Sequence, residues 1–313
     1  MASAQTVEDL RRLEIEILQF HQVCQMQAAL EDHDTSTIDQ TTLESLDIHI
    51  GQPLDIDEKG VWDFGTTFFQ PWVPREVIKA SAEDSEFKWM DRLITILRPV
   101  EWKYGYCKAQ WFHLCLGTLY EMDPNLWDPW NIDPTTIYLE TALRQPMRRI
   151  VFYNDENEEI FREYHPEAAY FPVDVTKPHV ASLVIDSHEA PGDKVLRSEV
   201  DYAIAMVLFR LKYRLHTNHH TKPAMIYTLE RDQFARVTQV HYDGKTNKLV
   251  LRQSRHLDLR GPRPTEDAFT LLRWMTSRPV GDTEYVDEAE EDEEDSTTPD
   301  SSNTAPKLLV GCA

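Results

Sequence analysis

The segment that decides the fold begins at Ser198 with SEVDYAIAMVLFRLKYRLH and continues through three short apolar runs: PAMIYTL (223–229), FARVTQVHY (234–242) and KLVLRQ (248–253). Apolar residues of the first run recur every three or four positions, which is typical of one buried helix face. That face comprises Val200, Ala203, Ile204, Val207, Leu208, Leu211 and Leu215. The other three runs have the length and composition of strands, and Asp243-Gly244 predicts a tight hairpin between the last two.

Further elements are predicted on both sides of this segment. A helix is expected over 266–277, because Thr265 is a suitable N-cap and acidic residues follow it. Strands are expected over 149–153 and 159–164, joined by a hairpin, and over 180–185. We therefore predict an α+β fold in which an antiparallel strand meander has flanking helices, with an aromatic-rich N-terminal half and a disordered acidic C-terminal tail.

The N-terminal part of the chain divides by composition. Residues 1–30 are predicted to form an amphipathic helix, which packs on its own domain or pairs with a partner helix. Because its apolar stripe is shorter than three heptads, we expect core packing. The stripe comprises Leu10, Leu13, Ile17, Phe20 and Cys24. Residues 31–60 are polar and are predicted to be a linker.

Residues 61–181 form an acidic, aromatic-rich region. Seven of the eight tryptophans lie between Trp62 and Trp130. Such a cluster can line a groove for a ligand, but large aromatic side chains serve cores more often. We expect an aromatic core.

Charge is distributed unevenly along the chain, whose formal net charge is −22. Residues 182–281 are basic, with the excess concentrated in 207–263, whereas 282–313 carry eleven acids and one lysine and are predicted to be a disordered tail. The overall acidity disfavours tight binding to nucleic acid. The basic stretch could hold an anion or face the chain's own acids, and we favour the second interpretation. The candidate anion-binding residues are Arg210, Lys212, Arg214, Arg252 and Arg255.

The expected compartment is the cytoplasm or the nucleus. No apolar run is long enough for a membrane-spanning helix, and residues 1–20 lack the apolar centre of a secretory signal. The four cysteines include no CxxC pair, so reduced thiols are expected.

Catalytic signatures are sparse. His216, His219 and His220 are metal-ligand candidates if their helix continues through them, but Pro223 argues that it does not. The helix–meander–helix order is also that of restriction-endonuclease-like nucleases, for which Glu199, Asp243 and Lys248 are catalytic candidates. Their Glu-x-Lys signature is missing, and without its central carboxylate such a site could not hold a cation. We predict no metal and no cofactor, and whether the chain is an enzyme stays open.

The run HHTKPAMIYTLERDQFARVTQVHYDGKTNKLVLRQSRHLDL (219–259) resembles segments of uncharacterised intracellular proteins from filamentous ascomycete fungi. The resemblance covers roughly 198–280 and rests on the texture of the strands and the Asp-Gly hairpin. It implies a fungal, intracellular origin. It implies no activity, and no functional residue can be transferred from it.

Two functional hypotheses follow. The first is a non-catalytic interaction protein, because the charges are segregated, the N-terminal helix is amphipathic and catalytic signatures are missing. Its partner would be another protein, or the acidic tail would cover the basic region. The second is a divergent metal-dependent nuclease or nucleic-acid-binding protein that uses 207–263. The oligomeric state is left open.

Overall fold

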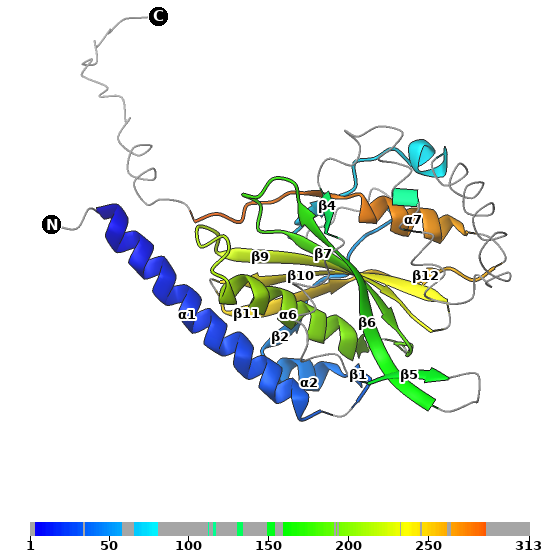
Figure 1. The fold of residues 1–313 in the computed structure, drawn as a ribbon, viewed down its shortest axis with the longest axis horizontal. Helices are drawn as coiled ribbons and strands as arrows, with labels where there is room; N and C mark the ends of the chain where they lie inside the picture. The colour runs from blue at the N-terminus through cyan, green and yellow to red at the C-terminus, as the bar shows by residue number, and fades with distance from the viewer. Residues whose placement is uncertain are drawn as a thin grey trace, which may run out of the picture.

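The computed structural model describes most of the chain in separate segments (Figure 1). They are residues 4–33, 35–57, 66–80, 112, 115–116, 130–133, 149–153, 159–190, 192, 194–231, 233–244, 246–261 and 264–285.

A mixed sheet of nine strands forms the centre of the described structure, and helices lie on both of its faces (Figure 1). Its main path has the order β2-β11-β10-β9-β7-β6-β4, while β12 pairs with β10 and β5 with β6. The strands of this sheet are β2 (Ile48–Ile50), β4 (Trp130–Asp133), β5 (Arg149–Tyr153), β6 (Glu159–Pro172), β7 (Val180–Asp186), β9 (Thr221–Leu229), β10 (Phe234–Asp243), β11 (Lys248–Gln253) and β12 (Leu257–Asp258). Two small sheets pair β1 (Thr37–Ile38) with β8 (Val195–Leu196), and β3 (Phe69–Gln70) with β13 (Arg278–Pro279). The described helices include α1 (Ala4–Glu31), α2 (Gln40–Ser45), α6 (Arg197–Lys212) and α7 (Glu266–Met275).

The predicted helix–meander–helix unit is confirmed as α6-β9-β10-β11-α7, and with it the α+β fold class. Strand β10 pairs antiparallel with both β9 and β11, and Asp243 lies opposite Lys248 at the hairpin. Gly244 is required in this turn, because a Cβ atom there would lie 2.4 Å from the main-chain oxygen of His220. Helix α7 begins as predicted, since the Thr265 side chain accepts a hydrogen bond from the Ala268 amide.

Helix α6 also connects two parallel strands, which the sequence did not lead us to expect. Strand β7 runs parallel to β9 in a register that pairs Val180 with Ala224 and Ile185 with Leu229. The carboxyl ends of β7 and β9 therefore meet at one edge of the sheet, beside the N-terminus of α6. In parallel α/β units such an edge is the usual position of a functional site.

The sheet separates two hydrophobic cores. One core joins α1, α2 and α6 to the sheet. The other joins α7 and the strand β3 to the opposite face and includes Phe69, Phe112 and Trp130. These side chains are at most 1% exposed, so the described part of the aromatic-rich region builds core, as predicted. The remaining tryptophans of the cluster, apart from Trp72, lie outside the described residues.

The prediction of a polar linker over 31–60 is wrong for residues 35–57. This segment forms β1, α2 and β2, and β2 extends the central sheet by pairing parallel to β11. Isolated apolar side chains anchor this segment in the cores. In the sequence they are separated by short polar stretches, so no regular apolar pattern is visible. These side chains are Ile38, Leu43, Leu46, Ile48, Leu54 and Ile56.

Helix α1 exists as predicted, but its buried face is not the predicted stripe. Leu10 is 61% exposed and Ile17 is 43% exposed. The buried side is rotated away from them and consists of Glu16, Gln19, Val23, Met26 and Leu30. The expectation that the stripe packs in the core is therefore wrong for Leu10 and Ile17.

The predicted tail begins later than residue 282. Thr283 is buried, and its main-chain oxygen accepts a hydrogen bond from the Thr221 amide. Glu284 forms an isolated bridge with His219, and the Tyr285 amide donates to the Asn218 carbonyl. Residues 282–285 thus belong to the body of the protein, and 286–313 lie outside the described residues.

Candidate functional site

The three nuclease candidates do not converge. Asp243 and Lys248 face each other at one end of the β10–β11 hairpin. Glu199 lies at the start of α6 and contacts Thr238, five residues before Asp243 on β10. Five strand residues span about 16 Å, so these side chains form no common site.

Glu199 has a structural role. Its carboxylate is fully buried and pairs with Arg236, whose Nε donates over 2.9 Å. The same carboxylate accepts hydrogen bonds from Thr238 Oγ1 at 2.8 Å, Gln253 Nε2 at 2.8 Å and the Leu196 amide at 3.0 Å. The Glu199 carboxylate thus accepts hydrogen bonds from β8, β10 and β11, and it connects α6 to β10 and β11.

Two of the anion-binding candidates are buried and hold main-chain oxygens. The Arg210 guanidinium donates to the carbonyl of His179, and burial lowers its pKa to about 9. Arg252 donates to the carbonyls of Gln52, Pro53 and Thr66 at 2.8–3.2 Å. Neither side chain faces solvent, so neither can bind an external anion.

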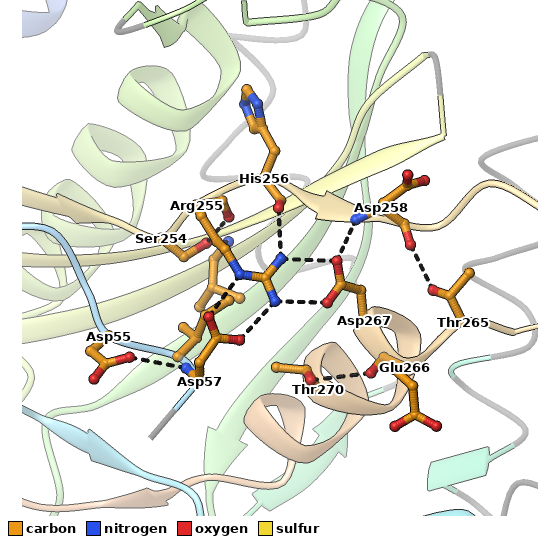
Figure 2. A network of polar contacts seen from close by, with 12 residues as sticks. Asp55, Asp57, Ser254, Arg255, His256, Asp258, Thr265, Glu266, Asp267 and Thr270 are labelled. Atoms are coloured by element: carbon orange, nitrogen blue, oxygen red, sulfur yellow. Dashed lines mark hydrogen bonds and ion pairs between the residues drawn. The ribbon is translucent and has the colours of Figure 1, made fainter. Parts of the chain in front are cut away.

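Arg255 is compensated by two carboxylates (Figure 2). It forms a two-bond contact with Asp57 at 2.7 and 2.9 Å and a second one with Asp267 at the same distances. Asp267 also accepts from the Asp258 amide at 2.7 Å. The network joins the segment after β2, the loop after β11 and the start of α7, so Arg255 braces three segments (Figure 2). Lys212 and Arg214, by contrast, are exposed at the end of α6.

The three histidines do not lie on one helix, because α6 ends at Lys212. His219 Nδ1 is 2.7 Å from Thr283 Oγ1, and His220 Nδ1 is 2.7 Å from Thr221 Oγ1. Burial lowers the pKa of His216 to about 4. Within the described residues, no group of three or more His, Cys, Asp or Glu side chains is arranged to hold a metal ion.

A polar cluster that the sequence analysis missed lies at the carboxyl ends of β7 and β9. Asp186 ends β7, accepts a hydrogen bond from Ser198 and lies 3.2 Å from His188 Nδ1. Glu230 follows β9, accepts from the Ala190 amide at 3.1 Å and lies 3.4 Å from His256 Nε2. In sequence, each acid directly follows an apolar strand, and this signal becomes readable only once β7 and β9 are known to be parallel.

Burial gives Glu230 an unusual protonation equilibrium. Desolvation raises its pKa to about 7, although Arg236 favours the charged form. The His188 and His256 side chains are about one-third exposed, at 35% and 32%. A carboxyl group with this pKa beside a partly exposed imidazole is able to exchange protons near neutral pH. Ser198 of this cluster donates its hydroxyl hydrogen bond to Asp186.

The second notable surface is the outer side of α1. Val7 (60% exposed), Leu10 (61%), Ile17 (43%) and Leu18 (64%) form what we call the α1 outer stripe. At 100° per residue these positions centre on the side of the helix opposite Glu16, Gln19 and Val23. Figure 1 shows α1 along one border of the molecule, with α6 on its inner side. Single exposed apolar residues are ordinary, but four large ones on one side of a helix make that side a candidate interaction surface.

The inner face of α1 is unusually polar around residues 16–19. Glu16 Oε1 accepts a hydrogen bond from Lys222 Nζ at 2.8 Å, and both side chains are nearly fully buried. Lys222 Nζ also donates to the carbonyls of His216 and His219 at 2.6 and 2.8 Å. Around residues 16–19, α1 therefore turns polar side chains toward its own domain and apolar ones toward solvent. This inverts the usual pattern of a surface helix.

Comparison with known proteins adds no assignment: no protein family, curated protein or solved structure matches the chain. The resemblance of 198–280 to ascomycete proteins stays a prediction. Among the described helices, none combines the length and the hydropathy needed to cross a bilayer.

Proposed function

We propose that the chain is a non-catalytic interaction protein of the cytoplasm or nucleus, and that it docks through the α1 outer stripe onto α1 of a second copy. The observation that carries this proposal is the exposure of four large apolar side chains on the side of α1 opposite its buried face. Covering such a stripe removes apolar surface from water, at roughly 25 cal/mol per Å². Exposed stripes of this kind therefore favour association.

The polar side chains beside the stripe favour a second copy in antiparallel orientation. Glu14 and His21 are exposed on the same side of α1, before and after Ile17 and Leu18. A two-fold axis near Ile17 and Leu18 places Glu14 of each copy beside His21 of the other. A parallel pair would instead place Glu14 beside Glu14, where like charges repel. The antiparallel arrangement thus sets Ile17 and Leu18 of the two copies against each other.

The nucleic-acid alternative receives less support from the geometry. Among the described bases of 207–263, Arg210, Lys222, Arg236 and Arg252 are buried. Arg255 and Arg260 form ion pairs with aspartates of the same chain. Basic side chains committed in this way cannot contact a phosphate backbone, so the positive stretch makes a much smaller surface than its composition suggests.

Light scattering coupled to size exclusion tests the proposal. We expect the molar mass of the wild type to rise toward that of a dimer with increasing concentration. An Ile17→Glu/Leu18→Glu variant should stay monomeric, because burying two carboxylates at the centre of the interface is unfavourable. Val175→Glu is the matched control, since Val175 is 82% exposed and lies outside α1. A wild type that is monomeric at all concentrations, or a dimer that persists in the double variant, would overturn the proposal.

A further inference from the structure

A second surface combines exposed apolar and basic side chains. It lies at the C-terminal end of α6 and on the loop between β6 and β7, and we call it the α6-end patch. Its apolar members are Val173 (42% exposed), Val175 (82%), Tyr213 (49%) and Leu215 (37%), and its exposed cations are Lys177, Lys212 and Arg214.

The two segments of the patch are neighbours in space. Burial lowers the pKa of both His216 and His219, and the main chain of Thr176 lies close enough to both rings to oppose this shift in part. The Phe209 and Tyr213 rings stack in a tilted arrangement with centroids 5.0 Å apart, and Phe209 also contacts Phe171 at the end of β6. Loop and helix end therefore present one continuous surface.

Within the described part of the chain, Lys177, Lys212 and Arg214 form no ion pair. Asp174, the acid of the same loop, accepts hydrogen bonds from the amide and the hydroxyl of Thr176, at 3.0 and 2.6 Å. It acts on Lys177 only through a longer-range electrostatic interaction. Lys212 and Arg214 differ in this respect from Arg255 and Arg260 of the same basic stretch, and together with Lys177 of the loop they can still bind an anion.

The chain leaves the described body beside this patch. The Tyr285 amide donates to the carbonyl of Asn218 at 3.1 Å, four residues after Arg214. Glu284 and Lys177 both act electrostatically on His219, so this end of the chain and the loop cation lie close together. Immediately beyond, eight of the nine residues 287–295 are acidic. A short tether keeps such a segment at an effective concentration of roughly millimolar.

We propose that the acidic segment 287–295 binds the α6-end patch of its own chain. The carboxylates would pair with Lys177, Lys212 and Arg214, whose side chains are exposed. The contact covers the patch and makes an external acidic protein compete with the tail. It is separate from the α1 outer stripe, so either proposal can fail without the other.

Zero-length cross-linking of the full-length chain tests this contact. A carbodiimide joins a lysine amine to a carboxylate only where the two are in contact. Mass spectrometry should find peptides that link 287–295 to Lys177 or Lys212. Lys194 is the matched control, because it is exposed and precedes α6, a helix about 24 Å long. We expect at least five-fold more links to Lys212 than to Lys194, and loss of the excess in 0.5 M salt, where charges are screened.

A mixture of unlabelled and ¹⁵N-labelled protein identifies the occupant. Links within one chain join peptides of the same isotope, whereas links between copies also give mixed pairs. The proposal is supported if the links in the wild type join peptides of the same isotope only. It also requires that the links to Lys177 are lost in the Lys212→Glu/Arg214→Glu variant. Three results would overturn it: mixed pairs at the statistical proportion, equal yields at Lys194 and Lys212, or no links to the patch.

Discussion

Glu230 is the side chain whose charge state is most clearly set by its surroundings. It faces Arg236 from β10, Glu199 from α6, Asp186 from β7 and His256 from the loop after β11. Desolvation dominates and raises its pKa to about 7. At Glu230 the folded protein therefore binds more protons than the unfolded chain between about pH 4.5 and 7, and the contribution of this carboxyl group to stability falls as the pH rises through this window.

Replacing Glu230 by glutamine removes this dependence. We expect Glu230→Gln to match the wild type near pH 4.5 and to exceed its unfolding free energy by about 3 kcal/mol at pH 8, because the variant avoids an ionised buried carboxylate. Urea unfolding across this pH range measures the difference. Glu76→Gln, at an exposed carboxylate, should show no such trend. Parallel pH profiles for wild type and Glu230→Gln would contradict the assignment.

Single side chains also show where inference from sequence ends. The positions of the basic residues were evident, but Arg210 and Arg255 are unsuited to bind an anion for reasons that sequence does not contain. Arg210 is buried and therefore out of reach of an external anion. Arg255 is already paired with two carboxylates from distant segments, Asp57 and Asp267. Lys212 and Arg214 belong to the same basic stretch of sequence, but in the structure their side chains are exposed.

At the scale of elements, periodicity predicted α6, α7 and the meander because each has a regular apolar pattern that packs on one core. It did not predict β1, α2 and β2, whose few apolar residues are separated by polar ones. For α1, the apolar stripe was evident in sequence, but which side of the helix packs depends on Lys222. This lysine comes from β9 and needs the buried Glu16 as its partner.

The Glu16–Lys222 pair should control how firmly α1 is attached. Glu16→Gln leaves the Lys222 ammonium buried without its counter-charge, and we expect a loss of about 3 kcal/mol. Glu14→Gln is the matched control, because Glu14 is exposed two residues earlier on the outer side, and its change should stay within about 0.5 kcal/mol. Hydrogen exchange of the α1 amides, measured on dilute protein, shows how each of the two substitutions changes the stability of this helix. Equal protection in the two variants would argue against this role.

At the scale of the whole molecule, the central sheet assembles segments that are far apart in sequence. The meander was predictable because its strands are neighbours in the chain. The parallel pairs β7–β9 and β2–β11 were not, since nothing local in either strand specifies a distant partner. The cluster of Asp186 and Glu230 depends on the first of these pairs and was missed for that reason.

The body of the protein should end at residue 285. Removing 286–313 should leave the melting temperature unchanged in 0.5 M salt, because charge contacts of this segment are then screened. Removing 282–313 should lower it by several degrees, since Thr283 is buried and the Arg12 guanidinium lies 5.4 Å from the centre of the Tyr285 ring. Calorimetry compares the two truncations. Equal melting temperatures would show that 282–285 contribute nothing to stability.

The antiparallel docking of α1 predicts a specific pattern of disulfide formation. The test uses two single-cysteine replacements, Glu14→Cys and His21→Cys, each in a chain whose Cys24, Cys107 and Cys312 are changed to serine. In the proposed dimer, position 14 of one copy lies beside position 21 of the other. Positions 14 and 14 would lie about 10 Å apart along the axis, too far for a disulfide.

The decisive measurement is the yield of disulfide-linked dimer after mild oxidation of each variant alone and of their equimolar mixture. We predict a linked dimer in the mixture and little in either variant alone. A linked dimer in the single variants would indicate parallel helices. No linked dimer in any sample would contradict the docking of α1 onto a second copy.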